Sequence, residues 1–164
     1  IPDSVTCIGE NAFIGCGSLA SIVVAGGNTV YDSRENCNAI IETATNTLIR
    51  GCQTSLIPNS VESIGMGAFS GCTSLTSITI PDSVTRIGAE AFHNCDSLES
   101  ITIPASVRSI EGGAFDWCEK LNSITFQGTI VQWEEIELGS CWINGVPTAV
   151  IHCTDGDVSV YSKS

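Results

Sequence analysis

The chain has 164 residues and a net charge of −12, and only 6 residues are lysine or arginine. An acidic chain of this kind repels a phosphate backbone, so nucleic acid is not an expected partner. Apolar residues make up 43% of the chain and aromatic residues only 6%, which suits thin aliphatic layers, and no apolar run reaches membrane-helix length, so no membrane insertion is expected.

Residues 1–23 form the first unit of a repeated pattern, and Ile1 stands at the first position of that unit. An uncapped first coil of a repeat protein would expose its strand edges and its core. We therefore expect the chain to be a piece of a longer array, or a mature end trimmed near a repeat boundary. The missing signal peptide then says nothing about localisation.

Residues 24–56 interrupt the pattern with 33 residues where 23 would be needed. Two short β-prone runs, Ala39–Glu42 and Thr47–Arg50, surround turn residues and predict a hairpin. Gly51-Cys52 resembles Gly71-Cys72, where the chain is expected to rejoin the stack. These observations favour an elongated variant coil in which a hairpin replaces the helical corner. A protruding recognition hairpin is the alternative.

Residues 57–125 contain three consecutive copies of one unit without an insertion. In the middle copy, Ser97–Ile103 alternates apolar and polar residues, which predicts a half-buried strand that ends at Pro104. A second short strand is expected at Ser83–Ile87. Gly88–Phe92 should then turn the corner as one helical or 3₁₀ turn, with Ala91 and Phe92 directed inward. Each unit can bury its apolar face only by stacking on its neighbours.

The shared pattern IPxSVxxIGxxAFxxCxxLxxI resembles the BspA-like leucine-rich repeats of large bacterial cell-surface proteins. It recurs at 1–23, 57–79, 80–102 and 103–125. The resemblance implies an α/β repeat fold, a right-handed leucine-rich-repeat solenoid that is strand-rich with short helical or 3₁₀ corners and spans 1–125. It also implies export to the cell surface, an extracellular location and a role in adhesion.

Two side-chain columns follow from the repeat. Phenylalanines at one offset should stack in the core, and cysteines at another should form a buried apolar ladder. The phenylalanines are Phe13, Phe69, Phe92 and Phe115, and the cysteines are Cys16, Cys72, Cys95 and Cys118. Cys37 with Cys52, or Cys141 with Cys153, could form a disulfide. The odd total of 9 cysteines argues against a full disulfide framework, and we expect mostly free thiols.

Residues 126–164 are expected to form a C-terminal cap. Val131–Ile136 predicts a helical turn or an irregular strand, and Asp155-Gly156 between β-prone runs predicts a hairpin. Trp133 and Trp142 should cover the open end of the last coil. The alternative is a carbohydrate-binding platform that uses them together with Trp117.

The sequence contains no recognisable catalytic, metal or cofactor motif. His93 and His152 stand near no nucleophile motif, and there is no CxxC or Cys/His cluster. Ala25-Gly-Gly-Asn28 lacks the lysine and the helix of a phosphate loop. We therefore expect that the chain is not an enzyme and that it has no catalytic residues, metal or cofactor.

The remaining candidate is a binding surface. Outward positions of the principal strand should form a flat hydroxyl ladder, and two arginines on the adjoining strand could recognise an acidic protein, although pairing with Glu62 or Asp82 would also explain them. The candidate residues are Ser77, Thr79, Ser100, Thr102, Ser123, Thr125, Arg86 and Arg108. We expect a non-enzymatic adhesion or protein-interaction module that binds a host or bacterial surface or matrix protein. The alternatives are a passive spacer and a carbohydrate-binding module.

Overall fold

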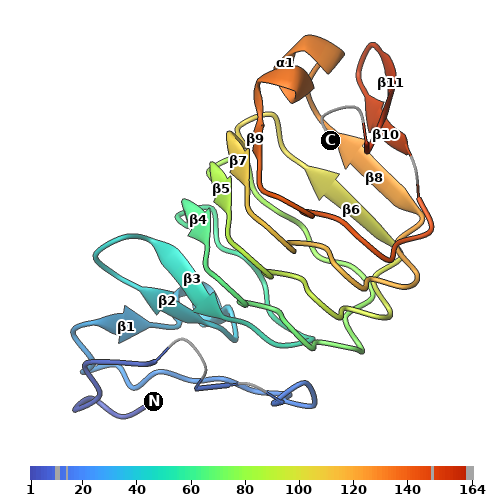
Figure 1. The fold of residues 1–164 in the computed structure, drawn as a ribbon. Helices are drawn as coiled ribbons and strands as arrows, with labels where there is room; N and C mark the ends of the chain where they lie inside the picture. The colour runs from blue at the N-terminus through green and yellow to red at the C-terminus, as the bar shows by residue number, and fades with distance from the viewer. Residues whose placement is uncertain (10–11, 14, 149, 162–164) are drawn as a thin grey trace.

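The computed structural model describes residues 1–9, 12–13, 15–148 and 150–161. The chain winds into coils that stack in sequence order from the N-terminus to the C-terminus (Figure 1). The elements are β1 (Tyr31–Asp32), a 3₁₀ turn (Arg34–Asn36), β2 (Ile40–Glu42), β3 (Thr47–Arg50), β4 (Ser63–Ile64), β5 (Arg86–Ile87), β6 (Ser100–Ile103), β7 (Ser109–Ile110), β8 (Ser123–Phe126), α1 (Ile130–Glu135), β9 (Glu137–Leu138), β10 (Val150–Cys153) and β11 (Gly156–Ser159). None of the helices among these residues is long and apolar enough to cross a membrane.

The coils contribute to two sheets. The larger sheet has the order β1-β2-β3-β4-β5-β7-β9, and the smaller sheet has the order β11-β10-β8-β6. Regular coils pair in parallel and in register, as Ile87 with Ile110 in the larger sheet and Ile101 with Ile124 in the smaller sheet show. A slip of one residue would turn these buried isoleucines toward solvent, so the constant repeat length specifies the register. The predicted strand-rich solenoid is confirmed.

The corner of each regular coil consists of tight turns. In the middle copy, Ala91 N donates to Gly88 O at 3.2 Å, and His93 N donates to Glu90 O at 3.1 Å. Glu90 has a left-handed φ of 54°, which prevents a continuous helical turn because helical residues need a negative φ. Phe92 N donates to Ala114 O of the next corner at 2.8 Å, so successive corners are joined as well.

The phenylalanine column begins at Phe69. Phe69, Phe92 and Phe115 are fully buried, and neighbouring rings stack with centroids 5.2 Å apart. Phe13 is only partly buried and packs in a separate cluster with Ile40, so its predicted place in the column is wrong.

The variant coil gives the reason for this break. The predicted hairpin is confirmed as the antiparallel pair β2–β3. Gly51 N donates to Ala68 O, as Phe69 N does to Ala91 O one coil later, so Gly51 holds the phenylalanine position. A Cβ at Gly51 would overlap the ring of Phe69. The glycine therefore ends the column and separates the first coil from it.

The cysteine ladder shows the same break. Cys72, Cys95 and Cys118 are buried, but Cys16 is exposed, which corrects the prediction for the first coil. Cys95 Sγ donates to Phe69 O at 3.3 Å. A hydrogen bond with Cys118 and burial raise the pKa of the Cys95 thiol, and burial raises the pKa of Cys72.

Residues that follow the last regular unit pack a short helix and two tryptophans against it. A capping box between Thr129 and Gln132 begins α1. Trp133 packs against Phe126 with ring centroids 5.3 Å apart, and Trp142 packs edge-on against Phe115 at 6.2 Å. Both tryptophans are buried.

Beyond residue 125 the chain also extends both sheets. β9 continues the larger sheet by pairing with β7. The predicted hairpin is confirmed as β10–β11, and β10 joins the smaller sheet by pairing with β8 in parallel.

Candidate functional site

A surface of short hydroxyl side chains lies on β6, on β8 and on the neighbouring residues 77–79. Thr79 pairs with Thr102 and Thr102 with Thr125, while Ser100 pairs with Ser123. Residues two apart on a strand share one face, so the structure brings together all six predicted hydroxyl residues. We call this surface the hydroxyl face, and it consists of Ser77, Thr79, Ser100, Thr102, Ser123 and Thr125.

Exposure follows the strand alternation. Ser100 and Thr102 are exposed, whereas Ile101 and Ile103 between and beside them are buried. Ser77, Thr79, Ser100 and Thr102 are all exposed, and Ser123 and Thr125 are partly buried. The face is therefore open to a partner at residues 77–79 and 100–102.

The hydroxyl face continues into a histidine–aspartate pair that was not among the candidate residues. His152 of β10 pairs with Thr125 of β8, and its Nδ1 lies 2.9 Å from Oδ1 of Asp157 on β11. Both side chains are at least half exposed, at 50% and 62%. His152 lies in one of the β-prone runs beside Asp155-Gly156, but the parallel pairing of β10 with β8 joins distant segments and has no local signal.

The structure places the two candidate arginines away from the hydroxyl face. Arg86 lies in β5 and Arg108 directly precedes β7, and both strands belong to the larger sheet. Arg86 Nε donates to Glu111 Oε1 at 2.8 Å, so its partner is Glu111 rather than Glu62 or Asp82. The structure therefore assigns the arginines and the hydroxyls to different sheets.

Arg108 is held by main-chain acceptors. Its Nη1 donates to Ala105 O at 2.7 Å and to Val107 O at 3.1 Å. Within the part of the chain that the structure describes, no ion pair of Arg108 is found. Its side chain is exposed, so this positive charge faces solvent in an acidic molecule.

A groove of about 400 Å³ lies at the edge of the hydroxyl face. It lies between residues 55–59, where the variant coil ends, and residues 77–79 of the next coil, and we call it the seam groove. This volume falls within the range of about 300–1,000 Å³ that is usual for ligand sites. Its lining includes Glu35, Leu56, Pro58, Ser77, Ile78 and Thr79.

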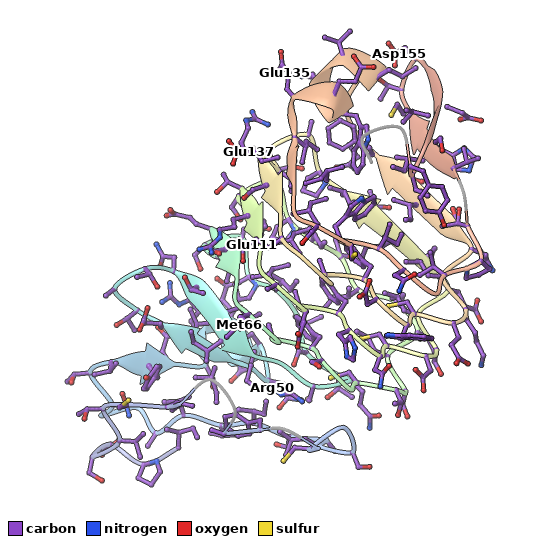
Figure 2. All side chains as sticks on the ribbon, in the orientation of Figure 1. Arg50, Met66, Glu111, Glu135, Glu137 and Asp155 are labelled. Atoms are coloured by element: carbon purple, nitrogen blue, oxygen red, sulfur yellow. The ribbon has the colours of Figure 1, made fainter. Side chains whose placement is uncertain are left out.

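A second hollow of about 440 Å³ occupies the place of the corner that the variant coil lacks. In a regular coil, residues 65–68 lie between Ile64 and Phe69. In the variant coil, only residues 49–50 lie between Leu48, which pairs with Ile64, and Gly51, which holds the phenylalanine position. Arg50 is 4% exposed, and its Nη1 donates to Gly67 O at 2.9 Å. Arg50 and Met66 both line this hollow, and Figure 2 labels both.

The tryptophans do not form a common surface. Trp133 is 0% exposed and Trp142 is 6% exposed, while Trp117 is 50% exposed at its corner. A carbohydrate platform built from all three side chains is therefore wrong, because two of them belong to the core.

Comparison with known proteins identifies the repeat. The BspA type leucine-rich repeat region matches residues 1–37 and 50–149 in six copies. The unmatched residues between these ranges contain β2 and most of β3, the hairpin of the variant coil. No curated protein matches the chain.

Solved structures share the fold. A leucine-rich repeat protein from Eubacterium ventriosum is 23% identical with a TM-score of 0.67, and the match covers 90% of this chain and 41% of that one. The pneumococcal vaccine antigen PcpA is 17% identical with a TM-score of 0.64, over 94% of this chain and 44% of that one.

A leucine-rich cell surface protein from Faecalibacterium prausnitzii is 30% identical with a TM-score of 0.49, over 84% of this chain and 49% of that one. The chain spans less than half the length of each of these three proteins.

Proposed function

Because the chain belongs to the BspA-type leucine-rich repeat family, we propose that it is a non-enzymatic protein-interaction module of a bacterial cell-surface protein. The observation that carries the proposal is the hydroxyl face. Parallel stretches in register present their alternate side chains on one surface, which is exposed at Ser77, Thr79, Ser100 and Thr102. Stacked repeats commonly bind partners along such extended surfaces.

The partner class is a protein of a host or bacterial surface or matrix, and the role is adhesion in an extracellular setting. The family relationship and the resemblance of the repeat support this part of the proposal. Short hydroxyl side chains lose little rotamer entropy when they are covered, and each can both donate and accept a hydrogen bond. They therefore suit a polar, close-fitting contact with a protein surface.

Arg86 and Arg108 belong to the proposal as a second contact region on the larger sheet. They are two of only 6 basic residues in a chain with a net charge of −12. The exposed charge of Arg108 would attract an acidic group of a partner. Arg86 would first have to give up its pair with Glu111.

The hydroxyl face can be tested with a single charged substitution at its centre. Thr102→Lys should weaken binding to an immobilised panel of purified extracellular-matrix proteins by about tenfold or more, because it projects a long cation from a flat face. Thr73→Lys is the matched control, since Thr73 is also an exposed threonine but lies in a turn outside the sheet. Both variants should melt like the wild type.

A passive spacer would give a different result. If the chain binds no protein of the panel, or if both lysine variants bind as the wild type does, the hydroxyl face is not a contact surface. The double variant Arg86→Glu and Arg108→Glu tests the larger sheet separately. Weaker binding at an unchanged melting temperature would support its contribution, and unchanged binding would remove it from the proposal.

A further inference from the structure

The smaller sheet has an open main-chain edge at the seam groove. Within the described segments 53–57 and 76–80, no backbone hydrogen bond joins the two coils. The same positions are joined one coil later, where Glu99 N donates to Thr76 O at 3.3 Å and Thr79 pairs with Thr102. The edge is therefore a local property of the variant coil and not of the repeat.

Alternate residues of a strand offer their main-chain groups to opposite neighbours. Thr76 O accepts a hydrogen bond from the following coil, so Thr76 and Ile78 are turned toward that coil. The N–H and C=O groups of Ser77 and Thr79 are then turned toward the seam groove. Among the described residues, no backbone hydrogen bond joins these four groups to residues 53–57 across the groove.

The opposite wall of the groove is held back by bonds to other segments. Leu56 N donates to Cys37 O at 2.9 Å, and Ser55 Oγ donates to Asn38 O at 2.6 Å. Thr54 Oγ1 donates to Ala20 O of the first coil at 3.1 Å. These contacts tie residues 54–56 toward the N-terminal side, so the groove is kept open by the fold.

The groove exposes apolar surface that the regular coils bury. Ile101 and Ile124 are 2% and 0% exposed, but Ile78 at the same position is only partly buried. Leu56 on the opposite wall is 67% exposed. Glu35 adds a negative charge to the lining, in a chain with a net charge of −12.

We propose that the seam groove binds an extended polypeptide segment, which adds as a strand to the main-chain edge at Ser77 and Thr79. Its apolar side chains pack on Ile78 and Leu56, and a basic side chain lies near Glu35. Strand addition supplies affinity through main-chain hydrogen bonds and selects side chains by the pockets beside the edge. The inference deepens the proposed function, on which it rests for the class of partner, but it uses a different surface from the centre of the hydroxyl face.

Amide hydrogen exchange provides the first test. In the free protein the amides of Ser77 and Thr79 should exchange about tenfold faster or more than those of Ser100 and Thr102, which hold the same positions one coil later. The probe is a short acetylated and amidated peptide that alternates valine with lysine. It should slow exchange at Ser77 and Thr79 and leave Ser100 and Thr102 unchanged.

The decisive control is the same peptide with its alternate backbone amides N-methylated. It keeps the charge and side chains of the probe but cannot form the main-chain ladder, so its binding should fall by about tenfold or more. Equal binding of the two peptides would show a general attraction of basic peptides to an acidic protein and would overturn the proposal. Failure of the unmodified peptide to bind would overturn it as well.

Two substitutions at residue 79 separate main-chain from side-chain recognition. Thr79→Pro removes the amide hydrogen that faces the groove and should abolish protection by the peptide. Thr79→Val keeps that amide, removes the hydroxyl, and should bind within about twofold of the wild type. If Thr79→Pro does not fold, Thr79→Val and the N-methylated peptide still decide the question.

A second copy of the chain is the other possible occupant, since β11 has one unpaired edge among the described strands. Sedimentation at increasing protein concentration tests it. Self-association that Thr79→Pro abolishes would overturn the proposal in favour of contacts between copies. The peptide experiments can fail while Thr102→Lys still weakens binding to matrix proteins, so the two proposals are tested separately.

Discussion

Arg50 lies beside the hollow that takes the place of the corner missing from the variant coil. Its Nη1 reaches Gly67 O, but Nε and Nη2 are buried without a hydrogen-bond partner among the described residues. A buried donor without a partner loses its hydrogen bonds to water and forms none within the protein, which lowers stability. The long side chain packs along the wall of the hollow, and its charge contributes little to stability there.

We expect Arg50→Met to leave stability unchanged or to raise it by about 1–2 kcal/mol, because methionine fills similar space without buried donors. Arg50→Ala is the control and should be less stable than Arg50→Met, since it removes side-chain packing and enlarges the hollow. Chemical denaturation of the three proteins measures both differences. A clear loss of stability in Arg50→Met would mean that the guanidinium is satisfied in solution by a group such as an anion.

Among the elements, the phenylalanine column links the corners of successive coils. Phe92 stacks on Phe69 with ring planes 2° apart and on Phe115 with planes 5° apart. The rings are nearly parallel because each is carried by an identical coil, and the strand spacing of about 4.7–4.9 Å brings them into contact. The column therefore depends on the uniform length of the units at 57–125.

Removal of the central ring should be costly. Phe92→Ala should lower the free energy of unfolding by about 3–5 kcal/mol, because it leaves a cavity between two packed coils. Phe13→Ala is the matched control: Phe13 has the same place in its repeat but is only partly buried, so its loss should cost clearly less. Equal losses in chemical denaturation would contradict the separation of Phe13 from the column.

At the scale of the whole molecule, the interior is divided at the variant coil. Residues from Ile57 to Val160, together with four residues of the variant coil, form one buried cluster. The first coil packs into a second cluster with Ile40, to which Phe13 and Leu19 contribute only partly buried side chains. Because stacked repeats are stabilised mainly by their nearest neighbours, a thin cluster at one end should open more easily than the centre.

Native-state hydrogen exchange under increasing denaturant should resolve this difference. The amides of Leu19 and Ile22 are hydrogen-bonded to Cys16 O and Asn38 Oδ1, yet they should exchange through local opening. The amides of Ile101 and Ile124, in paired strands, should exchange only through global unfolding. A single opening free energy for all four amides would show one cooperative unit and contradict the expectation.

The sequence by itself determined the repeat, its two strands and the register of the regular coils, because identical offsets must align when units stack. It also determined the hairpins at 40–50 and 150–159 through turn residues between β-prone runs, and the six hydroxyl residues of one face through strand alternation. These features depend on local patterns that each unit contains in full.

Only the tertiary structure decided which units stack on which. Gly51 ends the phenylalanine column, and its effect depends on the ring of Phe69, which lies on the next coil. The exposure of Cys16, the separate sheet of Arg86 and Arg108, and the alignment of His152 with Thr125 also arise from contacts between distant segments. The seam groove also depends on the tertiary structure, because a strand edge stays open only where the residues of the neighbouring coil form their hydrogen bonds with other segments. The local sequence does not show where this happens.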